Sequence, residues 1–197
     1  MSGAKDGSFF TVDAGGIAIY QCDDIEVRDN HISGVDVPIL LFVTQNNLVK
    51  GNTIVDAEGN GILLSSTGGN EIQENTISAG LAGIAVFSSD ENEIAENNCT
   101  MSFYGVQLVV SNHNELSDNV CDNNTVGVQL IVSDENTIGS DNQATDNDVY
   151  GIELGSSSDN NVVKKNVAFG NGTCDILVSN SSGNTQKKNE AGCISGF

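Results

Sequence analysis

A repeat of 22 to 24 residues is the feature that most constrains the fold of this chain. Glycine followed by Ile or Val, any residue, and another Leu, Ile or Val occurs at Gly16, Gly61, Gly83, Gly105, Gly127 and Gly151. Two further copies, "PILL" and "DILV", have Pro38 and Asp175 in place of the glycine. Eight units therefore follow one another in phase, which indicates a repeat architecture.

Asparagines recur in phase with the glycines. One series comes nine residues after the glycine position: Asn47, Asn70, Asn92, Asn114, Asn136, Asn160 and Asn184. The second series is Asn30, Asn52, Asn75, Asn97, Asn119, Asn142, Asn166 and Asn189, and the first unit has Ile25 in place of the first series. Asparagine tolerates the left-handed backbone of a turn. We therefore expect the side chains to stack from coil to coil as asparagine ladders.

The apolar runs within each unit are too short for helices and alternate with a period of two, as in "GIAVF" at 83–87. Helical repeats also need about 33 or more residues per unit. Three short strands per unit predict an all-β solenoid, a single-stranded parallel β-helix of about eight coils. We assign it residues 16–190, after a lead-in or plug over 1–15 that includes Phe9, Phe10 and Val12, and before a tail over 191–197.

Two columns of apolar residues are expected to fill the interior. One contains Ile72, Ile94, Leu116, Ile138 and Val162. The other contains Ile32, Ile54, Ile77, Cys99, Cys121, Ala144, Ala168 and Ala191. Cys99 and Cys121 are thus interpreted as small buried residues rather than a redox or metal site. The odd number of cysteines, five, argues against a full disulfide framework.

The stretch "GILLSSTGGNEIQENTI" and its copies resemble the right-handed parallel β-helix repeat of the NosD-like and carbohydrate-binding-and-sugar-hydrolase (CASH) families, which have a pectin-lyase-like fold. The resemblance implies a right-handed coil and favours an extracellular or cell-surface location, although "MSGAKDGSFF" shows no signal peptide. These families include lyases, hydrolases, epimerases, phage spikes and non-catalytic scaffolds. Function has to be argued from the site.

The net charge of −20 excludes some partners. Nucleic acid and anionic membrane surfaces would be repelled. No segment is long and apolar enough for membrane insertion, the longest candidate being "VPILLFV" at 37–43. Neutral sugars, cations and other proteins remain as partners.

The outer face of the first strand is where enzymes of the resembled fold generally work. The positions that we single out there as a binding or interface surface are Tyr20, Leu40, Phe42, Leu63, Phe87, Gln107, Val109, Gln129, Ile131 and Glu153. Glu153 is the one carboxylate on this face, and no base accompanies it, so the paired carboxylates of acid–base hydrolysis are missing. His31 and His113 are interpreted as turn residues, and no Met/His cluster suggests copper. We predict no catalytic residues.

An apolar stripe on that face has two uses that the sequence leaves open. Aliphatic residues outnumber aromatic ones, which favours a self-associating structural or surface scaffold or adhesion module, either a lateral homo-oligomer or an end-to-end filament. The bare ends of the solenoid indicate either a fragment of a longer chain or ends that meet another copy of the chain. Lysines gathered in the last coils, with acidic residues in the first, agree equally with end-to-end attraction and with a guard against edge pairing. The alternative is a polysaccharide-binding or polysaccharide-processing domain, with Tyr20, Phe42 and Phe87 as a platform for sugar rings.

Two acidic columns are expected on the surface. They contain Glu71, Glu93 and Glu115, and Glu74, Glu96, Asp118 and Asp141. Stacked carboxylates favour Ca²⁺ between coils, but one flat row supplies few convergent oxygens. A solvated face that discourages aggregation is the preferred interpretation, and no cofactor is predicted.

Overall fold

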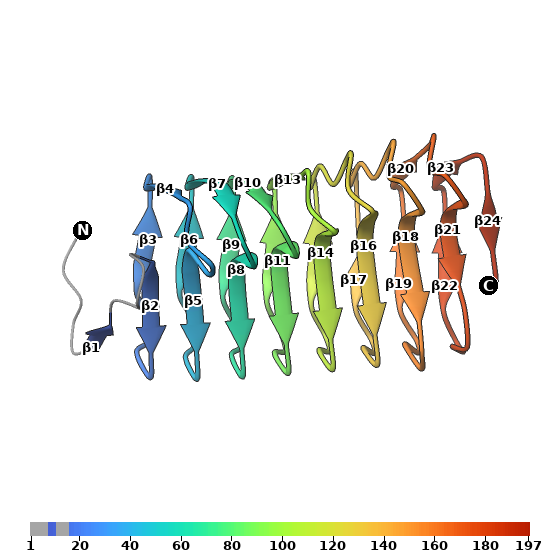
Figure 1. Ribbon diagram of the computed structural model, residues 1–197. Coiled ribbons are helices and arrows are strands. Elements are labelled where there is room, and N and C mark those ends of the chain that lie inside the picture. The colour runs from blue at the N-terminus through green and yellow to red at the C-terminus, as the bar shows by residue number, and fades with distance from the viewer. Residues whose placement is uncertain (1–7, 11–15) are drawn as a thin grey trace.

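The computed structural model describes residues 8–10 and 16–197, and these form a straight rod of stacked coils (Figure 1). Each coil contributes short strands to parallel sheets that run the length of the rod. The described part of the chain contains no helix with the length and hydropathy needed to cross a membrane. The prediction of an all-β, right-handed parallel β-helix of about eight coils is confirmed.

Sheet 1 has ten strands and presents the face on which the candidate site was predicted. Its strands, in spatial order, are β1 (Ser8–Phe10), β2 (Ile17–Tyr20), β5 (Ile39–Phe42), β8 (Asn60–Ser65), β11 (Ala82–Phe87), β14 (Tyr104–Val109), β16 (Val126–Ile131), β18 (Tyr150–Gly155), β21 (Cys174–Val178) and β24 (Ile194–Ser195). All neighbours pair in parallel except β1, which is antiparallel to β2. The plug predicted over 1–15 falls largely outside the described residues, Val12 included.

Sheet 2 has eight strands, one from each coil. They are β3 (Glu26–Arg28), β6 (Leu48–Lys50), β9 (Glu71–Gln73), β12 (Glu93–Ala95), β15 (Glu115–Ser117), β17 (Thr137–Ile138), β19 (Val162–Lys164) and β22 (Thr185–Lys187). Sheet 3 is interrupted, with β4 (His31–Ser33), β7 (Thr53–Ala57), β10 (Thr76–Ala79) and β13 (Asn98–Thr100) in one part and β20 (Val167–Ala168) and β23 (Glu190–Ala191) in the other. Isolated bridges at Val120 and Gln143 connect the two parts.

The core consists of apolar columns along the rod axis, as expected from the alternation. Ile72, Ile94, Leu116 and Ile138 are fully buried, but the column continues at Val163, and the expectation for Val162 was wrong. Cys99 and Cys121 are fully buried and free, which confirms their interpretation as core residues.

Close packing explains the recurrent glycine that begins each unit. A Cβ added at Gly83 would lie 2.7 Å from the carbonyl oxygen of Gly105 and 2.8 Å from Cβ of Cys99. These distances are shorter than any van der Waals contact between carbon and its neighbours. The glycine therefore lets adjacent coils and the cysteine column approach closely.

The two expected asparagine ladders are present and buried. In both, side-chain amides and backbone N–H groups of one coil donate to Oδ1 of the next asparagine; the bonds Asn75 Nδ2–Asn97 Oδ1 and Asn97 Nδ2–Asn119 Oδ1 measure 2.9 and 3.0 Å. The first ladder passes through Asn161, to which Asn136 donates, and the expectation for Asn160 was wrong. Asn160 has a φ of 56° and occupies the turn position one residue earlier. The turn between β18 and Asn160 is one residue longer than in the other coils. In it, Ser156 and Ser157 both adopt left-handed conformations.

A third ladder was not predicted. It passes through Asn124, Asn147 and Asn171 and ends on the carboxylate of Asp175, which accepts from Asn171 Nδ2 at 2.8 Å. Asp175 also accepts from the backbone N–H groups of Gly192 and Cys193. The carboxylate thus joins the end of the ladder to the segment that contains β24.

A disulfide between Cys174 and Cys193 holds the same segment against β21. The odd cysteine count is consistent with this single bridge, but the sequence did not reveal the pair. Residues 191–197, predicted to be a tail, contain β24 and thereby extend sheet 1 by one strand. The edge of β21 is therefore paired, and β24 becomes the edge strand of sheet 1.

Candidate functional site

The outer face of sheet 1 carries two straight rows of side chains, because its strands pair in register. The middle row, two residues after each glycine position, is Ala18, Leu40, Leu63, Ala85, Gln107, Gln129, Glu153 and Leu177. The turn-side row, four residues after that position, is Tyr20, Phe42, Ser65, Phe87, Val109, Ile131, Gly155 and Ser179. The structure therefore brings every residue of the predicted surface onto one face.

The stripe is less exposed than the sequence suggested. Tyr20 is 39% exposed, whereas Gln107 and Gln129 are each 8% exposed. The other residues predicted for this surface are half-buried: Leu40, Phe42, Leu63, Phe87, Val109, Ile131 and Glu153. Strands about 4.8 Å apart cover the flanks of one another's side chains, so mainly their outer ends reach solvent.

Gln107, Gln129 and Glu153, called the polar row below, form a continuous hydrogen-bonded chain across three coils. Gln107 Nε2 donates to Gln129 Oε1 at 2.8 Å, and Gln129 Nε2 donates to Glu153 Oε2 at 2.7 Å. A carboxylate only accepts, so Glu153 fixes the orientation of the Gln129 amide, which in turn fixes that of Gln107. The row is thus ordered before any ligand arrives. The sequence indicated the positions of these residues but not their bonds.

The apolar part of the face begins with an aromatic stack. The rings of Tyr20 and Phe42 lie with their centroids 5.5 Å apart and their planes 12° apart. Ser65 follows Phe42 in the turn-side row, and Phe87 follows Ser65. The row therefore alternates between ring-bearing and small side chains in these coils.

Exposed valines continue this apolar surface into the turn after each strand. Val43, Val110 and Val132 are 42%, 48% and 46% exposed. Their φ angles are 52°, 52° and 49°, a left-handed conformation that β-branched residues rarely adopt. The other coils place Gln21, Ser66, Ser88, Ser156 and Asn180 in equivalent turns. Local backbone preference does not explain valine at these three positions.

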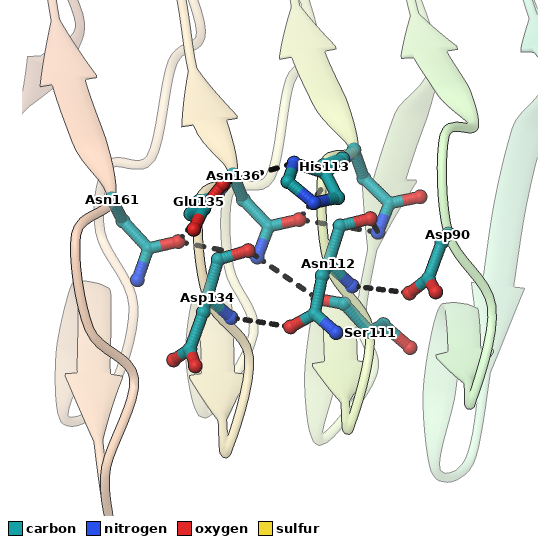
Figure 2. A network of polar contacts seen from close by, with 9 residues as sticks. Asp90, Ser111, Asn112, His113, Asp134, Glu135, Asn136 and Asn161 are labelled. Carbon is teal, nitrogen blue, oxygen red and sulfur yellow. Dashed lines mark hydrogen bonds and ion pairs between the residues drawn. The ribbon is translucent and has the colours of Figure 1, made fainter.

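A polar network occupies the next turn, between sheets 1 and 2 (Figure 2). Asn112 donates its backbone N–H to Asp90 Oδ1 at 2.6 Å, and Asp134 donates its own to Asn112 Oδ1 at 2.8 Å. His113 lies in a left-handed turn, and its Nδ1 is 3.4 Å from Oε2 of Glu135. These side chains bond to neighbouring coils. This placement agrees with the interpretation of His113 as a turn residue, whereas the same interpretation of His31 was wrong, because His31 begins strand β4.

The first acidic column lies in register, with Glu93 paired to Glu71 and to Glu115, and all three side chains are exposed. In the second, Glu74, Glu96, Asp118 and Asp141 occupy left-handed turns, and Glu74 forms an ion pair with Lys50 at 2.7 Å. Among residues 8–10 and 16–197, no group of three or more His, Cys, Asp or Glu side chains could hold a metal ion. The solvated face preferred from the sequence and the calcium alternative both stay predictions.

The buried thiols offer no reactive group. Burial raises the pKa of Cys99 to about 12 and that of Cys121 well above its ordinary value. A thiol needs its thiolate form to act as a nucleophile or a metal ligand. Both cysteines therefore stay protonated at neutral pH.

Two family models match the chain. The model described as periplasmic copper-binding protein (NosD) matches residues 4–105, and the model described as right-handed beta helix region matches residues 59–191. The donor set does not fit the copper of the first description, because Met101 is 73% exposed and His113 pairs with Glu135. No curated protein sequence matches the chain significantly.

Several solved structures share the fold. The periplasmic alginate epimerase AlgG superposes with a TM-score of 0.73 at 17% identity, over 88% of this chain and 46% of that one. The DFA-IIIase from Arthrobacter chlorophenolicus, solved with DFA-III, gives 0.62 at 16% identity, over 84% and 44%. An exopolygalacturonase from Thermotoga maritima gives 0.61 at 10% identity, over 87% and 54%.

These identities are low enough that the likeness shows the fold alone, and this chain spans slightly less than half of the alginate epimerase. The family matches go further, because each covers more than half of the chain. The chain therefore belongs to the NosD and right-handed β-helix families whose models it matches.

Proposed function

We propose that this chain binds an uncharged polysaccharide along the outer face of sheet 1. The polar row is the observation that carries the proposal. Its internal bonds use one N–H of each amide and leave the remaining amide hydrogens, Gln107 Oε1 and Glu153 Oε1 for a ligand. Sugar hydroxyls donate and accept, so they complement such a mixed row. Because the side chains are already ordered, binding costs less conformational entropy.

Charge supports an uncharged ligand. The chain has a net charge of −20, yet Glu153 is the one charged residue in the middle and turn-side rows. A uronate polymer would meet the negative potential of the whole rod, whereas a neutral polymer would not. The face is thus distinguished from the rest of the surface by its lack of charge.

The named activities of the similar structures support a saccharide ligand. They are an alginate epimerase, an exopolygalacturonase and an enzyme in complex with DFA-III. These activities favour the polysaccharide alternative over the self-associating scaffold that the sequence placed first. A periplasmic or extracellular location is part of the proposal. It is supported by the NosD description and by the Cys174–Cys193 disulfide, since disulfides persist in oxidising compartments.

We assign binding rather than catalysis to the described residues. General acid–base chemistry on a glycosidic bond ordinarily uses two carboxyl groups on either side of the bond. On this face Glu153 stands between Gln129 and Leu177. The carboxylate therefore orients the polar row and can accept a sugar hydroxyl.

The test is electrophoresis in native gels that contain a soluble neutral polysaccharide such as hydroxyethylcellulose. Wild-type protein should be retarded, and Gln107→Ala with Gln129→Ala should migrate as in a gel without polymer. Gln73→Ala, on sheet 2, is the matched control and should bind like wild type. Glu153→Gln keeps an acceptor for Gln129 and should retain binding. Unchanged retardation of the double variant would refute the site.

Self-association along the same face stays a prediction. The exposed, strained valines Val43, Val110 and Val132 favour a contact with another surface. Light scattering at high protein concentration tests it, because a lateral oligomer has a fixed mass and end-to-end rods grow with concentration. If the protein is a strict monomer, the face is not covered by another copy and is available to the saccharide.

A further inference from the structure

A gap one coil wide interrupts the rings of the turn-side row. Phe42 pairs with Ser65, and Ser65 pairs with Phe87, so one serine separates the two phenylalanines along the rod. Parallel strands lie about 4.8 Å apart, which places Phe42 and Phe87 about 9.6 Å apart. A small hydroxyl side chain thus occupies the position between two phenylalanines in this row.

The Tyr20 ring determines how Phe42 faces this gap. Tyr20 belongs to the preceding coil, and its ring is nearly parallel to that of Phe42. A ring that stacks on the preceding coil turns its opposite face toward the following coil. For Phe42 the following coil is the one that supplies Ser65.

The gap has the dimensions of one sugar ring. Optimal carbon–carbon contact is about 3.5 to 4.0 Å, so a ring held on both faces needs about 7 to 8 Å plus the pucker of its chair. Two stacked rings would not fit. A β-linked, glucose-type unit has axial ring hydrogens and therefore two apolar faces, while its equatorial hydroxyls point outward. The Ser65 hydroxyl can donate to or accept from such a group.

We propose that Phe42, Ser65 and Phe87 form a subsite that holds one uncharged sugar unit of a β-linked polysaccharide between the two rings. The inference rests on the proposed function and names its anchoring subsite. Phe87 lies one coil before Gln107. The subsite therefore adjoins the polar row, and five partly exposed, uncharged side chains lie on its coils: Leu40, Phe42, Leu63, Ser65 and Phe87.

Ser65→Phe tests the subsite because it fills the gap while extending the Tyr20–Phe42 stack. Aromatic pairs are favourable, so the variant should unfold at the same or a higher temperature than wild type. Its apparent affinity for hydroxyethylcellulose in native gels should fall by at least about tenfold, the change that corresponds to loss of one good contact. Ser179→Phe, in the same row at the far end of the sheet, is the matched control and should bind like wild type. Dextran, an α-linked polymer, should bind more weakly than hydroxyethylcellulose.

The outcomes separate this inference from the proposed function. Full binding by folded Ser65→Phe, with binding lost in the Gln107→Ala/Gln129→Ala variant, would overturn the subsite and leave the proposed function standing. If wild-type protein binds no neutral polysaccharide, both fail. A wild-type dimer that Ser65→Phe dissociates would instead identify the gap as a contact between copies of the chain and overturn the sugar assignment. If Ser65→Phe loses its β-sheet circular dichroism, Phe87→Ser is tested in its place. We expect Phe87→Ser to bind more weakly than wild type, and unchanged binding would overturn the subsite.

Discussion

Replacement of Asn97 by alanine is the sharpest test of the ladders. Asn97 is 1% exposed, and its side chain takes part in five hydrogen bonds. Oδ1 accepts from the backbone N–H and Nδ2 of Asn75, while the two hydrogens of Nδ2 are shared among Ile72 O, Ala95 O and Asn119 Oδ1. Each bond contributes about 0.5 to 1.5 kcal/mol, and buried groups left without partners cost more. We expect Asn97→Ala to lower the free energy of unfolding by about 3 to 5 kcal/mol.

The assay is urea unfolding followed by circular dichroism. Asn98→Ala is the matched control, because Asn98 is the next residue but its side chain is exposed. Its effect should lie within about 0.5 kcal/mol of zero, as for most surface substitutions. Equal midpoints for the two variants would refute the reasoning that buried ladder bonds hold the coils together. Coils that unfold separately would appear as a broadened transition, and the midpoints then replace the free energies in the comparison.

Three further predictions concern the strained turns, the disulfide and the acid response. Val110→Asn should raise the melting temperature in differential scanning calorimetry, because it relieves about 1 kcal/mol of left-handed strain. A lower melting temperature would show that contacts of the valine side chain stabilise the fold by more than the strain costs. Thiol titration in urea without reductant should find three reactive groups, and five would contradict the bridge. Cys174→Ser with Cys193→Ser should lower the free energy of unfolding by about 3 kcal/mol. Burial raises the pKa of Asp175, but hydrogen bonds from Asn171, Cys193 and Gly192 outweigh it and hold the pKa below its ordinary 3.8. The charged carboxylate therefore stabilises the fold above pH 3.8, and this stabilisation is lost as pH falls through the lowered pKa. The decrease in unfolding free energy between neutral and acid pH, measured in urea, should be smaller for Asp175→Asn than for wild type. An identical decrease would contradict this assignment.

The repeat made the fold predictable because its period and alternation leave few ways to bury the apolar residues. Both main ladders and the cysteine column followed from that. The error at Asn160 and Val162 arose because the turn after β18 has one extra residue, which shifts the ladder to Asn161 and the core to Val163. Counting from the glycine cannot locate such an insertion.

The parts that the sequence did not reveal depend on contacts rather than on period. The third ladder contains three asparagines in phase, Asn124, Asn147 and Asn171, but it begins with a serine and ends on Asp175, so its pattern is short and mixed. The polar row was placed correctly on the face, but the bonds that order it depend on side-chain geometry. The spacing of the cysteines likewise does not show that the chain turns back to bring Cys193 to Cys174.

Binding of a neutral polysaccharide along the outer face of sheet 1 can be followed residue by residue in an NMR titration. Amide signals of ¹⁵N-labelled protein would be followed as soluble cello-oligosaccharides are added, with side-chain amides of Gln107 and Gln129 as internal reporters. The account predicts shifts that concentrate in β8, β11, β14, β16 and β18 and include both glutamine side chains, with sheet 2 unchanged. Shifts confined to sheet 2 or its turns, or no saturable shifts at millimolar ligand, would contradict it.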